Sequence, residues 1–310
     1  MKKKQVFLSF DIETIVSRRS RNLDYKVTVT QGALEIARLL REIGLKGTFF
    51  ISLSTKDASL NSSEYLKEIR NLVLCLKGFE NIDIQPHIHA LNLPVSFECP
   101  SDSFADYNLQ QQTEMLIWAK EFFSEMGVQV SGFRSGSYLS GDSYYQALEM
   151  AGYSFSSLMD TSKAPNINLI DKTANSSEVM SKVGEIKEFN VTTVKVKSIK
   201  PGVIEQVNLS PDFFTLNSVK YAFKDLECLN INFHSFSMFS NRLARENHDG
   251  QLRNNLCFYL LQKPLILLAD LVGLKTYSPK TIFNQELNHW LDEFTSEQYE
   301  TIFYSEVEVV

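Results

Sequence analysis

The chain has 310 residues, 44% of them hydrophobic, and a net charge of −6 at pH 7. A chain of this length and composition can bury a large core without disulfides to hold it together. Acidic residues outnumber lysines and arginines by 37 to 31, which argues against a nucleic-acid backbone as the main partner and favours a neutral sugar or a small amide.

Neither the cysteines nor the apolar runs indicate secretion or membrane insertion. The four cysteines are scattered without metal-ligand spacing, so we expect them to be reduced and buried in a cytoplasmic protein. The basic start MKKK precedes an apolar run of only residues 6–10, which predicts a strand and not a signal peptide. The most apolar stretch, residues 256–274, is interrupted by Gln262, Lys263, Pro264 and Asp270; it falls short of a transmembrane segment and predicts a kinked pair of buried helices, with a peripheral membrane contact as the alternative.

Strands and helices alternate from the start of the chain. The apolar periodicity predicts strands at 5–13, 47–52 and 82–89, separated by helices at 32–43 and 62–76. A long helix at 110–126, a strand at 130–134, a helix at 142–151 and a strand at 153–158 follow. Repeated units of this kind predict a parallel barrel and not two domains.

The second half of the chain is less regular. Residues 159–211 are rich in polar residues and predict an insertion over the rim of the barrel, with one buried strand at 186–194. A strand at 229–233 ends at His234, and a helical segment begins at Gln251. The tail at 284–310 predicts an extension made of a helix and a short segment packed on the barrel. We therefore expect one domain over residues 1–310.

Two of the predicted strands end in side chains that bind metals. The first ends in Asp11 and Glu13, and the third ends in His87 and His89. Since a strand alternates faces, each pair points to one side, with the histidines roughly 6 to 7 Å apart. The carboxyl ends of parallel strands meet at one rim, and carboxylate with imidazole suits Zn²⁺ or a similar ion. Three protein ligands would leave a position open for catalysis. The alternative is that these histidines are hydrogen-bonded structural residues.

Five short segments follow one another in the order expected for successive barrel strands. They are SFDIE (9–13), GTFF (47–50), PHIHA (86–90), GFRSGSY (132–138) and NFHSF (232–236). Together they resemble the polysaccharide deacetylases of carbohydrate esterase family four, the NodB-homology fold, over roughly residues 5–275. The resemblance implies an α/β fold, a distorted (β/α) barrel of about seven strands. It also implies a divalent metal, usually zinc, that serves to hydrolyse an acetyl group from an N-acetylated amino sugar.

The resemblance assigns roles to residues of the SFDIE and PHIHA segments. Asp11 takes the place of the general base, and Glu13 takes that of the acidic metal ligand, although Ile12 separates two residues that are normally adjacent. His87 corresponds to the first histidine ligand. The family's second histidine lies four residues later, where this chain has Leu91, so either His89 supplies that ligand or fewer protein groups hold the metal.

The last two motifs supply the remaining catalytic groups. Arg134 matches the family arginine, which would orient Asp11 and keep it ionised. Gly136 stands where the family has a proline. His234 corresponds to the general acid that protonates the leaving amine, and an imidazole is suited to that task near neutral pH. The family pairs this histidine with an acidic residue, for which the sequence offers Asp160 as the nearest candidate, displaced from the usual place.

These assignments predict a metal-dependent N-deacetylase of glycan or surface-polysaccharide metabolism, with no cofactor besides the metal. Two alternatives stay open. The chain could be a non-catalytic relative that keeps the barrel and binds a glycan or a partner, or a deacylase of an amide that is not a sugar. The sequence leaves the oligomeric state and the identity of the substrate open.

Overall fold

The computed structural model describes residues 3–14, 25–55, 62–197, 202–238 and 285–307. Its main feature is a curled nine-stranded sheet in the order β12-β1-β2-β3-β4-β5-β9-β8, with β13 beside β1. Its strands are β1 (Lys4–Ile12), β2 (Gly47–Ser52), β3 (Ile82–Ile88), β4 (Gly132–Ser135), β5 (Phe155–Ser156), β8 (Met180–Val183), β9 (Ile186–Phe189), β12 (Cys228–His234) and β13 (Tyr299–Thr301). All neighbours in this sheet are parallel except β8 and β9. The predicted distorted β/α barrel is confirmed.

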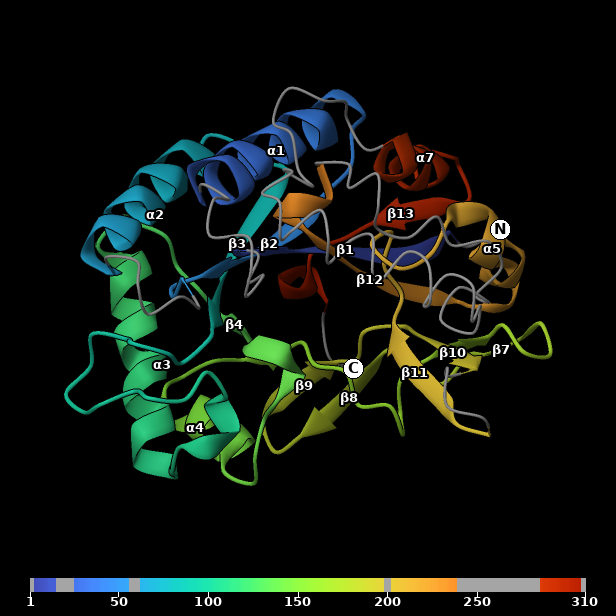
Figure 1. Ribbon diagram of the computed structural model, residues 1–310. Helices are drawn as coiled ribbons and strands as arrows, with labels where there is room; N and C mark the ends of the chain where they lie inside the picture. Colours follow the sequence, from blue (N-terminus) through green and yellow to red (C-terminus); the bar gives the residue numbers. More distant parts are fainter. Residues whose placement is uncertain (1–2, 15–24, 56–61, 198–201, 239–284, 308–310) are drawn as a thin grey trace, which may run out of the picture.

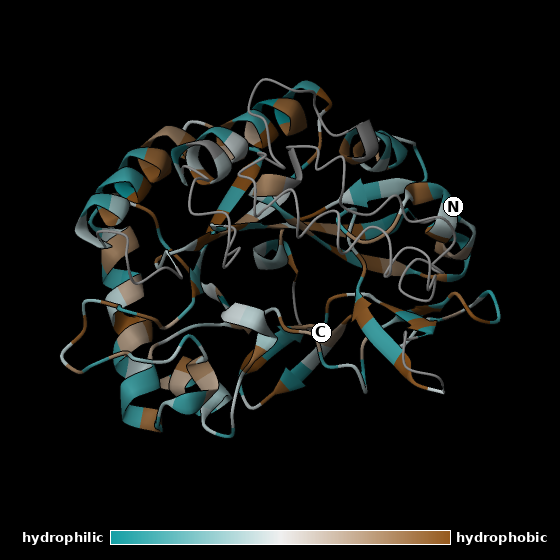
Figure 2. Cartoon of the chain, in the orientation of Figure 1, coloured by the Kyte–Doolittle hydropathy of each residue, from teal (hydrophilic) through white to brown (hydrophobic). Residues whose placement is uncertain are grey.

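Helices lie along the outer side of the curled sheet (Figure 1). They are α1 (Gly32–Glu42), α2 (Ser62–Leu76), α3 (Leu109–Ser124) and α4 (Tyr144–Met150), and a π-helix, η1 (Lys26–Gln31), leads into α1. A capping box fixes the start of α3, because the side chains of Asn108 and Gln111 each accept a hydrogen bond from the other's backbone N–H. Both hydrophobic and hydrophilic residues occur on α1, α2 and α3 (Figure 2), as expected for helices with one face on the sheet.

The alternation of β1 decides which side chains enter the barrel. Its residues from Val6 to Ile12 are all buried, because one face packs against the helices and the other fills the interior. Phe10 faces outward in the large helix–sheet core, whereas Phe7 belongs to a separate cluster inside the barrel. Asp11 has the parity of Phe7 and therefore shares its face.

Residues 159–211 contribute to two sheets. β8 and β9 extend the main sheet, and a smaller sheet has the order β11-β10-β6-β7. Its strands are β6 (Asn166–Asn168), β7 (Thr173–Asn175), β10 (Thr193–Lys197) and β11 (Ile204–Asn208). The single strand predicted at 186–194 is wrong in extent: β9 ends at Phe189, β10 begins at Thr193, and the two strands lie in different sheets. Between the two strands, the backbone N–H groups of Asn190 and Val191 donate hydrogen bonds to the carbonyl oxygens of Val179 and Leu158.

The remaining elements are short, apart from one helix in the tail. They are η2 (Phe104–Asp106), η3 (Gly136–Tyr138), α5 (Leu216–Val219), η4 (Lys220–Asp225), η5 (Ser235–Met238), α7 (Gln285–Glu293) and η8 (Tyr304–Glu306). β13 pairs with residues 4–6 of β1. η8 places Tyr304 inside the barrel, where its ring stacks on Phe7 with the centroids 4.8 Å apart.

Three cysteines fall within the described residues, and all three are free thiols. Cys99 is buried and Cys228 half-buried, but Cys75 is exposed on the outer face of α2, so the expectation that all are buried is wrong for it. The helices predicted at 256–274 and from Gln251 lie outside the described residues. Among the helices that the structure describes, none has the length and apolarity needed to cross a membrane.

Candidate active site

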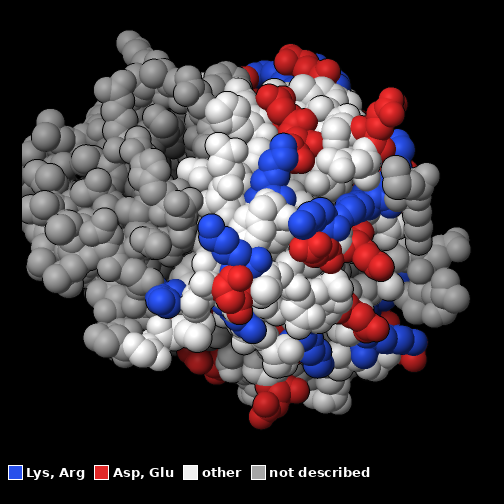
Figure 3. Space-filling model, turned by 90° about the vertical axis from the view of Figure 1, so that its right-hand side faces the viewer, with Lys and Arg blue, Asp and Glu red and all other residues white. Residues whose placement is uncertain are grey.

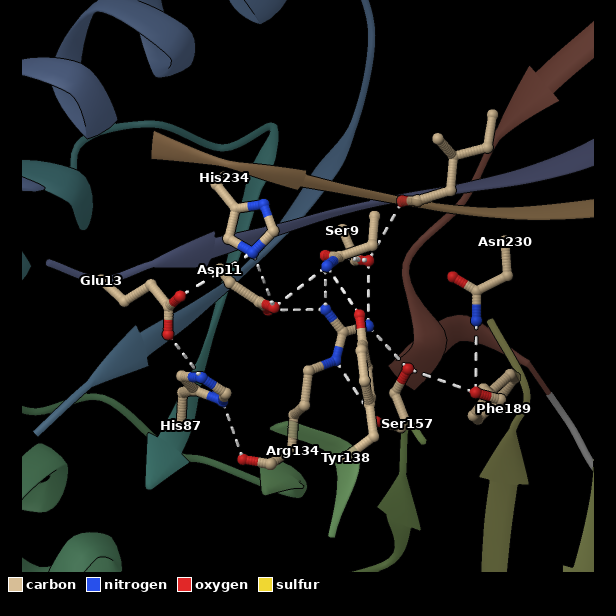
Figure 4. A network of polar contacts seen from close by, with 12 residues as sticks. Ser9, Asp11, Glu13, His87, Arg134, Tyr138, Ser157, Phe189, Asn230 and His234 are labelled. Atoms are coloured by element: carbon tan, nitrogen blue, oxygen red, sulfur yellow. Dashed lines mark hydrogen bonds and ion pairs between the residues drawn. The ribbon is translucent and has the colours of Figure 1, made fainter. Parts of the chain in front are cut away.

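Glu13, His87 and His89 come together at the carboxyl ends of β1 and β3. All three are buried, and each offers one ligand atom within 4.8 Å of the others. The Nε2 atoms of both histidines point at the same oxygen, Oε2 of Glu13, at 3.1 Å for His87 and 2.9 Å for His89. Figure 4 shows Glu13 and His87 facing each other beside His234. The residues named by the sequence as metal ligands are therefore neighbours in space.

The other nitrogen of each imidazole is engaged by an acceptor. Nδ1 of His87 donates to the carbonyl oxygen of Arg134 at 3.0 Å, and Nδ1 of His89 donates to Oδ1 of Asp102 at 3.0 Å. A proton on Nδ1 leaves the lone pair of a neutral imidazole on Nε2. Burial lowers the pKa of His87 below its usual value although Asp11 and Glu13 oppose the change, so the neutral form is favoured. The Nε2 lone pairs of the two histidines and the carboxylate of Glu13 therefore face one another, and together they are ligands that a cation can bind.

Arg134 and Asp11 form an ion pair inside the barrel. The guanidinium is fully buried and donates from Nη1 to Oδ1 of Asp11 at 2.7 Å and to Oδ1 of Asn232 at 2.8 Å. Its Nη2 donates to the hydroxyls of Ser9 and Ser157 at 2.9 and 2.7 Å (Figure 4). Burial alone would raise the pKa of Asp11, but the charge of Arg134, together with those of His87 and His234, holds the pKa below its usual value.

Arg134 also has ring neighbours. Its guanidinium lies 4.0 Å from the centroid of the Phe50 ring and 5.7 Å from that of Tyr138. A charged group so completely enclosed needs these partners, because an unpaired buried cation would be costly. The arginine thus fixes the position of Asp11 as well as its charge.

His234 lies across the rim from the histidine pair. Its register partner is Asp11, since β12 runs beside β1. Its Nε2 lies 3.9 Å from Oδ2 of Asp11 and 3.8 Å from Oε1 of Glu13. Its Nδ1 contacts Oδ2 of Asp212 at 2.7 Å. Burial would lower the pKa of His234, but the hydrogen bond and charge of Asp212 raise it above the usual value.

The acidic partner of His234 is therefore Asp212 and not Asp160. Asp160 bonds to Ser162 and pairs with Lys163 at 3.7 Å instead. Sequence reasoning missed Asp212, which follows β11 and lies one residue beyond the region predicted to be an insertion. It also missed Asp102, in the segment between β3 and α3. No strand pattern marks either position.

Gly136, which replaces the family proline, leaves room for His89. A Cβ atom at position 136 would lie 2.4 Å from Nδ1 of His89. The next two residues, Ser137 and Tyr138, have φ of 55° and 59°, a conformation that costs energy for side chains other than glycine. The turn brings the Tyr138 hydroxyl to 2.6 Å from Nδ2 of Asn232, which also donates to Asp11. The altered histidine spacing and the altered GFRSGSY segment are thus compatible in space.

Comparison with known proteins gives similarity of fold. No family model matches the sequence, and no curated protein matches it. A 4-alpha-glucanotransferase from Thermococcus litoralis matches 99% of this chain at a TM-score of 0.50 and 11% identity, but the chain spans only 40% of that protein. A putative polysaccharide deacetylase from Mycobacterium smegmatis matches 99% of this chain and 96% of its own (TM-score 0.46, 12% identity).

A family 4 carbohydrate esterase from Streptomyces lividans, in complex with acetate, covers 54% of this chain and 66% of its own (TM-score 0.34, 14% identity). Polysaccharide deacetylases are thus among the solved structures to which the chain is similar, as the five motifs predicted. At these identities the similarity concerns the fold alone.

Proposed function

We propose that the protein is a metal-dependent N-deacetylase that hydrolyses the acetamide of an N-acetylated amino sugar. The observation that carries the proposal is the meeting of three groups at one rim: the Asp11–Arg134 pair, the Glu13–histidine cluster and the His234–Asp212 pair. His234 lies within 4 Å of both Asp11 and Glu13, so a carboxylate base and an imidazole acid face the same place.

Glu13, His87 and His89 would hold the metal, and their chemistry favours Zn²⁺. Two neutral imidazoles and one carboxylate are a common ligand set of catalytic zinc, whereas calcium and magnesium prefer oxygen ligands alone. When bound, such a cation polarises a carbonyl group and lowers the pKa of a water molecule. The convergence of two Nε2 lone pairs on one carboxylate oxygen supports this assignment.

The protein's own residues move the protons. Asp11 accepts a proton from the attacking water as the new carbon–oxygen bond forms, and Arg134 keeps its carboxylate ionised for that step. His234 donates a proton to the nitrogen as the carbon–nitrogen bond breaks, so that acetate and a free amine result. The raised pKa of His234 favours the protonated form that this role requires, and Asp212 steadies the ring.

The setting we propose is glycan or surface-polysaccharide metabolism in the cytoplasm. The free thiols of Cys75, Cys99 and Cys228 fit a reducing compartment. Among the described residues on the face that Figure 3 shows, basic and acidic residues are interspersed, without the single-sign patch of a nucleic-acid-binding surface. A neutral acetylated sugar therefore fits the chain better than a polyanion.

The test combines metal content with acetate release from a panel of N-acetylated amino sugars. We expect about one zinc ion per chain in the wild type, and its loss in the His87→Ala, His89→Ala double variant. Glu13→Gln should weaken binding, because an amide is a poorer ligand for a dication than a carboxylate. His289→Ala, a change at an exposed position of α7, is the matched control.

Full zinc content in the double variant would disprove the ligand assignment. Bound zinc without acetate release from any sugar would leave a deacylase of another amide, or a non-catalytic glycan-binding protein, as the better account. Release of acetate that depends on both histidines would support the proposal.

A further inference from the structure

We propose that Asp102 is a positioning residue that makes His89 a metal ligand despite the unusual spacing of the two histidines. The inference rests on the proposed function, since it takes Glu13, His87 and His89 as the metal site. It adds a residue from outside the five motifs, and it explains how a histidine two positions after the first can serve.

The two histidines are held in different ways. His87 lies within β3, opposite Arg134 of β4, and its Nδ1 bonds to the carbonyl oxygen of that residue. The sheet itself therefore orients His87. His89 follows the last residue of β3, Ile88, so it lies beyond the ladder of backbone bonds that holds its neighbour. Its ring must be oriented by something other than the sheet.

Asp102 supplies that orientation from the segment that joins β3 to α3. Both carboxylate oxygens lie near Nδ1 of His89, at 3.0 and 3.1 Å. The backbone of Asp102 is fixed as well, because its carbonyl oxygen accepts a hydrogen bond from the N–H of Ala90 at 3.1 Å. The same two stretches of chain are thus joined by a backbone bond and by the contact between the two side chains.

Two further contacts limit the His89 ring. The backbone of Gly136 lies so close that a Cβ atom there would be 2.4 Å from Nδ1 and 2.5 Å from Cε1 of the ring. The His87 ring meets it edge-on, with the centroids 4.8 Å apart. With Asp102 on Nδ1, these contacts leave Nε2 aimed at Oε2 of Glu13, 2.9 Å away.

A carboxylate on Nδ1 affects a histidine ligand in two ways. It holds the proton on Nδ1, so that Nε2 keeps its lone pair, and it increases the electron density of the ring. Loss of such a partner usually weakens metal binding 10- to 100-fold. Asp102 is half-exposed and contacts Nδ1 of His89, whereas Nε2 of the same ring faces Glu13, so its effect should be on the metal and not on proton transfer.

The experiment measures the zinc dissociation constant of the full chain by competition with a chromophoric chelator at one fixed pH. We expect the constant to rise about 10- to 100-fold in Asp102→Ala. It should rise less in Asp102→Asn, which keeps an acceptor oxygen without the charge. Glu98→Gln is the matched control, because it removes one negative charge from an exposed position of the same segment and should leave the constant unchanged. Circular dichroism checks that each variant is folded, and Asp102→Asn carries the test if Asp102→Ala is not.

A second measurement separates this inference from the proposed function. In the metal-free protein, nitrogen-15 NMR should show a hydrogen-bonded Nδ1–H of His89 that is lost in Asp102→Ala and kept in Glu98→Gln. Wild-type protein that binds zinc, with an equal constant in Asp102→Ala, would overturn the role of Asp102 and leave the metal site standing. Wild-type protein that binds no zinc would refute the proposed function. If the wild type binds no zinc, the NMR measurement still tests Asp102. A His89 Nδ1–H signal that is the same in the wild type and in Asp102→Ala would overturn the positioning role of Asp102 as well.

Discussion

Exchanging the carboxylate of Asp11 with the amide of Asn232 should separate the stability of the site from its catalysis. Arg134 Nη1 donates to Oδ1 of both side chains, at 2.7 and 2.8 Å, and Asn232 Nδ2 donates to Oδ2 of Asp11 at 3.0 Å. In Asp11→Asn, the new amide must point its N–H groups either at Arg134 or at the amide of Asn232. Donors then face each other in a buried place, and the guanidinium loses its counter-charge.

The expected cost follows from this geometry. Breaking a buried ion pair by removing one partner destabilises a protein by about 3–5 kcal/mol. For a domain of this size, that corresponds to a fall in the melting temperature of roughly 10 °C. Because Asp11 is also the proposed base, acetate release should fall by roughly 10²- to 10⁴-fold. Zinc content should stay near that of the wild type, since Glu13, His87 and His89 are unchanged.

The double variant Asp11→Asn, Asn232→Asp restores the charge beside Arg134. Its carboxylate can accept from the guanidinium, from the new amide on β1 and from the Tyr138 hydroxyl, so stability should return to within about 1 kcal/mol of the wild type. Activity should stay low, because the carboxylate now lies on β12, about 4.8 Å from β1. Urea unfolding, zinc analysis and acetate release measure the three quantities. An exchange that fails to recover stability would refute the account of the ion pair, and one that recovers activity would refute Asp11 as the base.

Three further outcomes are expected. His234→Ala should keep zinc and lose roughly 10²- to 10⁴-fold in activity, the usual contribution of a positioned proton donor; loss of zinc would make His234 a ligand instead. Gly136→Ala should raise the zinc dissociation constant, because the added Cβ displaces the His89 ring; an unchanged constant would contradict the close approach. Burial raises the pKa of Glu188 to about 7 from an ordinary 4.5. The folded state therefore binds the proton of Glu188 more tightly than the unfolded state, and the stability that this proton contributes is lost as the pH rises from 4.5 through 7. Glu188→Gln should be equal to the wild type near pH 4 and more stable by about 3 kcal/mol above pH 7; a gain independent of pH would exclude this cause.

The regular part of the fold was predictable because the apolar residues of its strands recur either in runs, as in β1, or at alternate positions, as in β3. β1 and β3 lie within one residue of their predicted bounds, and β12 ends at His234 as expected. The side chains at those ends could be named because the carboxyl ends of parallel strands share one rim. The roles assigned to Asp11, Glu13 and the histidines stay predictions until they are measured.

The supporting groups were not predictable by the same reasoning. Asp102 and Asp212 lie in irregular segments, where no periodicity fixes the direction of a side chain. β6 and β7 are three-residue strands with polar residues, too short for a pattern to emerge. The interval from Phe189 to Thr193 contains strand-favouring residues and no glycine or proline to mark a break, and only the pairing partners on either side divide it between two sheets.

Tyr304 has a consequence for the order in which the molecule is assembled. Its ring lies among Phe7, Phe50, Phe155 and Phe189, and its hydroxyl donates to Oδ1 of Asn230 at 2.6 Å. A ribosome makes the first four rings long before this tyrosine emerges. Until then, the aromatic cluster inside the barrel lacks one of its largest side chains, and the surface of the four phenylalanine rings stays open to water and to chaperones. Contacts of such sequence separation close slowly, so completion of the barrel must wait for the residues around position 304.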